Sequence, residues 1–149
     1  SIYFLGAAEG VAQQAAKNLT TLHPQLQIAG YYSPPFGFEH DDAECQRIVD
    51  QINQCSPDMV FVGLGAPKQE LWIAKYRHSL NTGALLGIGA SIAFAAGTEK
   101  RAPLIMQKIG LEWFYRLLQD PRRLVLRYLK DFTFVLIVYR TWRGKYQKQ

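Results

Sequence analysis

Lys68, Gln69 and Glu70 stand together in the stretch GLGAPKQELWIAKYR (63–77), directly after a glycine-punctuated loop. Glycine lets backbone N–H groups approach an anion closely, and long polar side chains at a helix start can reach toward it. Pro67 suits the first helical turn, where a missing N–H costs nothing. The same residues also fit a simple tight turn and a solvated helix start. Because neither G-x-G-x-x-G nor a Walker loop is matched, spacing alone leaves both interpretations open.

The elements that must position these residues alternate along the chain. Short apolar runs, typical of buried strands, occur as SIYFLG, LQIAGYY, DMVFVGLG and GALLGIGA, and helical patterns lie between them, one from Pro67 to about His78. This alternation predicts an α/β fold with a Rossmann-like parallel sheet and flanking helices. Ligands bind at the carboxyl ends of such strands. The glycine-bearing ends FLGAAEG, FVGLGAPKQE and GIGASIAFAAG are therefore expected along one edge.

The charge is distributed unevenly. Up to Glu99 the chain has five Lys/Arg and nine Asp/Glu, a net charge of −4, whereas from Lys100 onward twelve Lys/Arg face three acidic residues, a net charge of +9. A basic segment of this kind favours phosphate, nucleic acid or an anionic lipid surface as its partner. The sequence thus predicts two parts, a Rossmann-like nucleotide-side half domain (1–103) and a basic helical appendage (104–149).

The sequence gives little support for a metal site, a disulfide or a membrane-spanning helix. Cys45 and Cys55 lack C-x-x-C or Cys/His spacing, the three histidines are scattered, and EHDD (39–42) is more typical of a solvated loop than of a metal site. We therefore expect no cofactor and no obligatory metal. No apolar run of about 18 residues and no secretory signal is present, which favours a cytoplasmic location.

A longer set of motifs resembles a known family. The segments VGLGAPKQELWI and GIGASIAFAAGTEKRAPLIMQKIGLEWFYRLLQDPRRL, together with the loop GYYSPPFGFE, resemble the WecG/TagA/CpsF glycosyltransferases, over residues 2–129 in one register. The resemblance implies transfer of a sugar, of the N-acetylmannosamine type, from a UDP-sugar to a polyprenyl-diphosphate-linked acceptor in bacterial cell-surface polysaccharide synthesis.

The resemblance also implies roles for particular residues. The leaving diphosphate needs positive groups, and forked arginine donors suit phosphate oxygens. Gln69 would orient a sugar or phosphate oxygen, and Glu70 would accept from sugar hydroxyls or serve only the helix dipole. The expected diphosphate-binding residues are Lys100, Arg101, Arg116, Arg123 and Arg127. The expected nucleotide-sugar-binding residues are Gly6, Gly63, Gly65, Lys68, Gln69, Glu70 and Gly89.

Two departures from the family pattern qualify this expectation. Family chains have a further N-terminal half that supplies the aspartate proposed as general base, and residue 1 here already matches the second half. We therefore expect no catalytic base in this sequence and no sugar transfer by it alone. Ala93 stands where typical members have aspartate in G-A-x-F-D-F-x-x-G. If that aspartate holds the nucleotide, uridine binding is weakened here.

The C-terminal segment predicts a membrane contact. Arg123, Arg127 and Lys130 form one stripe of a helix whose remaining surface is apolar, and aromatic residues alternate with cations up to Lys148. We expect residues 122–146 to lie in an anionic membrane interface, on the inner face of the plasma membrane. The apolar residues before Pro121 are instead expected to be buried against the sheet. They are Leu111, Trp113, Phe114, Leu117 and Leu118.

Three classes of function fit these observations. The first is a glycosyltransferase, or its nucleotide-side half, acting on a lipid-linked acceptor. The second is another Rossmann-like enzyme such as a dinucleotide-dependent oxidoreductase, against which the missing G-x-G-x-x-G counts. The third is a non-catalytic, membrane-associated module. Nucleic acid is not expected as a partner, because a phosphate backbone has no need of the continuous apolar face. The sequence favours the first class.

Overall fold

The structure is a computed structural model that describes residues 1–100, 102–119 and 121. The chain divides into two compact units, Ser1–Lys100 and Arg101–Gln149. The basic helix expected over residues 122–146 lies outside the described residues, as do Arg101, Arg123 and Arg127.

The first unit contains a parallel sheet of four strands in the order β2-β1-β3-β4. The strands are β1 (Ile2–Gly6), β2 (Ile28–Tyr32), β3 (Met59–Gly63) and β4 (Ala84–Gly87). Between and after them come α1 (Val11–Leu22), the 3-10 turn η1 (Phe38–His40), α2 (Asp42–Cys55), α3 (Lys68–Tyr76) and α4 (Ser91–Ala96). The predicted α/β class with a Rossmann-like parallel sheet is confirmed.

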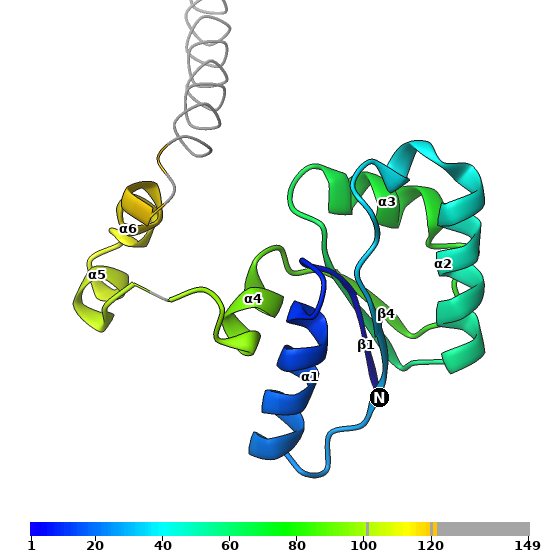
Figure 1. The fold of residues 1–149 in the computed structure, drawn as a ribbon, viewed down its shortest axis with the longest axis horizontal. Coiled ribbons are helices and arrows are strands. Elements are labelled where there is room, and N and C mark those ends of the chain that lie inside the picture. The colour runs from blue at the N-terminus through cyan, green and yellow to red at the C-terminus, as the bar shows by residue number, and fades with distance from the viewer. Residues whose placement is uncertain (101, 120, 122–149) are drawn as a thin grey trace, which may run out of the picture. The chain divides into compact units, whose positions relative to one another are not determined.

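Helices cover both faces of this sheet, which explains why its central strands are apolar on both sides (Figure 1). Along β1, Tyr3 and Leu5 pack with α2 and α3, whereas Ile2 and Phe4 pack with α1 and α4. Because successive side chains of a strand point to opposite faces, this single strand supplies both cores. Packing on both faces therefore holds the central strands in their register.

Glycines let the ends of the central strands meet. Gly6 ends β1 with φ 114°, and a Cβ there would lie 2.6 Å from the Gly63 carbonyl oxygen of β3. A Cβ on Gly63 would in turn lie 2.6 Å from Ile92 Cδ1 and 2.9 Å from the Gly89 carbonyl oxygen. The three glycine-bearing loops therefore come together at one edge of the sheet, as the sequence predicts.

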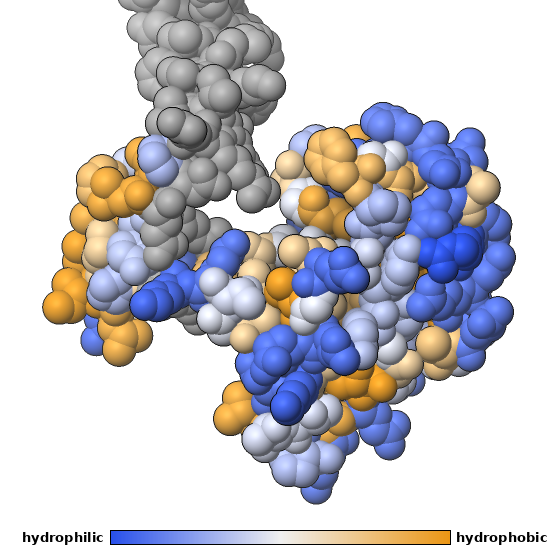
Figure 2. Space-filling model, in the orientation of Figure 1, coloured by the Kyte–Doolittle hydropathy of each residue, from blue (hydrophilic) through white to orange (hydrophobic). Residues whose placement is uncertain are grey.

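The second unit shows two short helices, α5 (Leu104–Lys108) and α6 (Glu112–Gln119). The expectation that the apolar residues of this segment are buried is wrong for most of them. Trp113 is 51% exposed and Leu118 63% exposed, and Leu111 and Phe114 are exposed as well. Figure 2 shows hydrophobic surface, coloured orange, over α5 and α6. Leu104, Ile105 and Ile109 are exposed too. Helices of five and eight residues provide too little partner surface to cover them.

Within the part of the chain that the structure describes, no helix is long and apolar enough to span a membrane.

Candidate functional site

A cavity of about 700 Å³ opens at the carboxyl ends of β1 and β2, beside the start of α1. Two segments line it, the β1–α1 turn with the first turn of α1, and the end of β2 with the loop that follows. Its lining residues are Ala7, Ala8, Glu9, Gly10, Gln13, Tyr31, Tyr32, Ser33, Pro34 and Pro35. This is the edge at which open parallel sheets bind their ligands.

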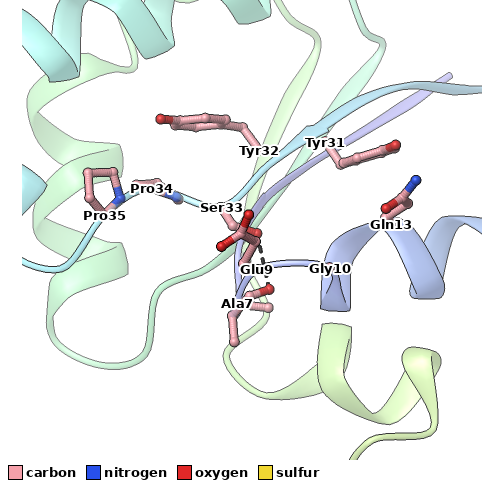
Figure 3. A pocket seen from close by; sticks show the side chains of 10 residues that line it. Ala7, Glu9, Gly10, Gln13, Tyr31, Tyr32, Ser33, Pro34 and Pro35 are labelled. Atoms are coloured by element: carbon pink, nitrogen blue, oxygen red, sulfur yellow. Dashed lines mark hydrogen bonds between the residues drawn. The ribbon is translucent and has the colours of Figure 1, made fainter.

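The local backbone explains how this cavity forms. Ala7 has φ 64°, which is rare for a residue with a side chain, and its N–H donates to the Gly63 carbonyl oxygen over 3.2 Å. The Ser33 hydroxyl donates to the Ala8 carbonyl oxygen over 3.2 Å and so ties the end of β2 to the β1–α1 turn. The dashed line in Figure 3 marks this bond. The cavity thus has a floor fixed by two strands.

The lining offers several kinds of chemistry. In Figure 3, Glu9 and Ser33 lie in the middle, with Tyr31 and Gln13 on one side and Tyr32, Pro34 and Pro35 on the other. A carboxylate and a hydroxyl can bind sugar hydroxyls, and an aromatic ring can stack on a planar base. Helix α1 has Gly10 as its N-cap and no side-chain cap. The Val11 N–H donates to the Ala8 carbonyl oxygen, and the other N–H groups of the first turn can face an anion. Such a combination suits a nucleotide.

The predicted binding residues after β3 form hydrogen bonds with the chain itself. Gln69 is only 7% exposed, and its Oε1 accepts a hydrogen bond of 3.0 Å from the Gly89 N–H. Its Nε2 donates to Glu70 Oε1 over 2.8 Å. Gly65, with φ 79°, and Gly89, with φ 53°, have open space where a Cβ would be. Gln69 therefore joins the start of α3 to the loop after β4.

Lys68 is held in an ion pair. Its Nζ lies 2.5 Å from Glu39 Oε1 of η1, and it also lies 5.3 Å from the ring centre of Phe36. A hydrogen bond from the Lys68 ammonium lowers the pKa of the Glu39 carboxyl, so this carboxylate stays charged near neutral pH. In the structure, Lys68 thus neutralises a carboxylate of the chain. The EHDD segment is otherwise structural, because Asp41 caps α2 and Asp42 pairs with Lys75.

A second hollow of about 400 Å³ lies between η1 and α3. Its walls include Leu71, Trp72 and Tyr76 together with Pro67 and the stems of Lys68 and Lys75. This lining is mostly apolar, and its cations are already paired with Glu39 and Asp42. The first cavity therefore suits a polar, nucleotide-like ligand better.

The predicted diphosphate-binding residues are spread over both units. Lys100 is exposed at the end of the first unit, and Arg116 belongs to α6 of the second. Ala93 lies within α4 and does not line the larger cavity. Among the described residues, no group of three or more His, Cys, Asp or Glu side chains is placed to hold a metal ion.

Sequence reasoning named the two segments that supply most of the cavity lining but assigned a binding role to none of the lining residues. FLGAAEG, which contains Glu9, is expected at the ligand-binding edge, and GYYSPPFGFE is identified only as a loop that resembles the family's. Glu9, Gln13 and the segment Tyr31 to Pro35 are therefore not among the expected binding residues. The signal was present, since this loop follows a parallel strand and must start at the ligand-binding edge.

The fold is a parallel α/β domain with a cavity at its strand ends, and similarity to known proteins shows its family. The family model described as "Glycosyl transferase WecG/TagA/CpsF family" matches residues 1–148. The chain belongs to this family of glycosyl transferases.

Two relatives have the same printed name, N-acetylglucosaminyldiphosphoundecaprenol N-acetyl-beta-D-mannosaminyltransferase. The relative from Bacillus spizizenii is 39% identical over 122 residues, which is 82% of this chain and 45% of the relative. The one from Staphylococcus aureus strain MW2 is 34% identical over 123 residues, 83% of this chain and 46% of the relative. The chain therefore spans about half the length of the curated relatives it matches.

Proposed function

We propose that this chain is the nucleotide-binding part of a glycosyltransferase that transfers a sugar from a UDP-sugar to a polyprenyl-diphosphate-linked acceptor. Two observations carry the proposal. A glycosyl transferase family model matches residues 1–148, and a nucleotide-sized cavity with polar groups lies at the strand ends. The relatives' name specifies an undecaprenol-diphosphate-linked acceptor and an N-acetylmannosaminyl donor group. We propose the same class of acceptor and the same class of donor sugar for this protein.

The donor would bind with its nucleoside in the cavity between the β1–α1 turn and the end of β2. Tyr31, 41% exposed, offers a ring on which uracil can stack. The Glu9 carboxylate accepts hydrogen bonds from ribose hydroxyls, and the first-turn amides of α1 face a phosphate group. Because these groups are polar, they favour a nucleotide over an apolar ligand.

Isothermal titration of the chain with UDP tests this proposal. UDP is expected to bind, and both Tyr31→Ala and Glu9→Gln should weaken binding. Leu22→Gln is the control, because Leu22 is exposed at the far end of α1 and lines no part of the cavity. Equal UDP affinity in the unchanged chain and in both cavity variants would contradict the proposed site.

The proposed nucleotide site has no obligatory metal. Backbone amides at the start of α1 supply the positive end of a helix dipole to the phosphate. UDP affinity should therefore be the same with excess EDTA and with added Mg²⁺. A clear gain in affinity with Mg²⁺ would overturn this part of the proposal.

The acceptor is a lipid, and we propose that the second unit contacts the anionic inner face of the plasma membrane. The exposed apolar residues of α5 and α6 support this, because interfacial segments present Trp, Phe and Leu to the headgroup region. The net charge of +9 from Lys100 onward adds attraction to anionic lipid. The arginines expected to bind diphosphate belong to the same unit.

A further inference from the structure

Tyr32 joins the larger cavity to helix α2. Tyr32 is among the residues that line the cavity, and its hydroxyl donates a hydrogen bond of 2.7 Å to Glu44 Oε1 on α2. Arg47, also on α2, lies with its guanidinium carbon 4.8 Å from the centre of the Tyr32 ring and donates from Nη2 to the Tyr32 hydroxyl. The ring is thus held at its hydroxyl end and over its face.

Glu44 and Arg47 also bind each other. Arg47 Nε donates to Glu44 Oε2 over 2.8 Å, and Nη2 donates to Glu44 Oε1 over 2.7 Å, which is the forked geometry of a strong ion pair. Contacts with Arg47 and then with Tyr32 lower the pKa of the Glu44 carboxyl to about 2. The pair therefore remains charged throughout the neutral range. Neither residue lines the cavity.

We propose that Glu44 and Arg47 are positioning residues that hold the Tyr32 ring as a wall of the nucleotide site. This inference rests on the proposed function, because it assumes that a nucleotide occupies the cavity. A ring already fixed in place loses little conformational entropy when a ligand packs against it. A free ring would have to be ordered by the ligand, and affinity would fall.

UDP affinity in a double-mutant cycle tests this role. Arg47→Met removes the guanidinium and keeps much of the stem, and it should weaken UDP binding by about 2- to 10-fold, the range for freeing one side chain. In a Tyr32→Leu background, the same change should have no further effect, because the ring it positions is gone. Gln46→Ala is the matched control on α2, since the Gln46 side chain bonds Asp50 over 2.9 Å and, in the described part of the chain, forms no hydrogen bond with Tyr32, Glu44 or Arg47.

A conservative variant separates positioning from simple attraction between Arg47 and the UDP phosphates. Arg47→Lys keeps the positive charge but loses the fork, so it should weaken UDP binding nearly as much as Arg47→Met. Full affinity in Arg47→Lys, or equal weakening by Arg47→Met in both backgrounds, would overturn the inference. The inference would also be overturned if UDP affinity stayed the same in every Arg47 variant. If the unchanged chain bound no UDP, the proposed function would fail, and this inference with it.

Discussion

At the scale of single residues, Gln69 shows how a side chain expected to touch ligand can instead shape the site. Its amide joins the Gly89 N–H to the Glu70 carboxylate while the residue itself is buried. A polar residue at a helix start after a glycine loop is compatible with either role. Which one it fills depends on how close the β4–α4 loop approaches, and local sequence does not specify that distance.

Gln69→Leu should therefore destabilise the fold. Leucine has a similar size but cannot accept from the Gly89 N–H, and a backbone donor left without a partner costs about 1–3 kcal/mol. The free energy of unfolding, measured in urea, should fall by that amount. Glu70→Gln is the control, because an amide oxygen can still accept from Gln69 Nε2. Unchanged stability in Gln69→Leu would mean that the Gly89 contact contributes nothing.

At the scale of elements, the Glu44 carboxylate links α2 to β2 through its hydrogen bond with Tyr32, beside the buried apolar face of α2. The pKa of Glu44 is about 2 in the folded chain, lowered from 4.5 by Arg47 and Tyr32. A lowered pKa in the folded state stabilises the fold fully above the unfolded pKa, and that contribution is lost as pH falls through the folded pKa. Stability should thus decline from about pH 4.5 toward pH 2, partly because of this group.

The variant Glu44→Gln should flatten this decline. It removes the ionisable group, so the slope of unfolding free energy against pH between about 4.5 and 2 should become smaller. Some slope should remain, because Glu39, Asp42 and Asp58 also have lowered pKa values. Asp50→Asn on the same helix serves as the control. An unaltered slope in Glu44→Gln would show that the Tyr32–Glu44–Arg47 contacts do not persist in solution.

The elements themselves could be predicted well from the sequence. Buried strands such as MVFVG and the helices between them have strong patterns, and right-handed crossovers leave few arrangements of a parallel sheet. The meeting of Gly6, Gly63 and Gly89 followed from that topology. The cavity did not, because Tyr31 and Ser33 acquire their roles only when β2 lies beside β1.

The prediction for α5 and α6 failed for a different physical reason. Trp113, Phe114 and Leu118 have the spacing of a helix that packs on a core, and spacing alone does not say what covers the face. Their exposure changes the interpretation of the second unit. A surface of this kind favours the membrane as partner of a chain that we propose to act on a lipid-linked substrate.

At the scale of the whole molecule, the account predicts that the second unit binds anionic vesicles. Trp113 is exposed on α6, so its indole should enter the headgroup region and the tryptophan emission should shift to shorter wavelength. Apolar burial should let binding survive moderate salt better than a purely electrostatic contact would. Trp113→Gln with Leu118→Gln should reduce vesicle co-sedimentation. The double change Trp72→Phe with Leu71→Gln, on α3, should not.

Two outcomes would contradict membrane docking by the second unit. One is undiminished co-sedimentation after deletion of residues 104–149. The other is a chain that ignores anionic vesicles but binds duplex DNA.

The central claim, a nucleotide site at the carboxyl ends of β1 and β2, is tested most directly by nuclear magnetic resonance titration with UDP. The account predicts that the first amide signals to move belong to Glu9, Gly10, Gln13, Tyr31 and Ser33, and that Tyr31→Ala reduces these shifts. Shifts confined to residues 122–148 would instead identify UDP as a generic polyanion bound by the basic segment. That result, or the absence of any shift around the cavity, would contradict the account.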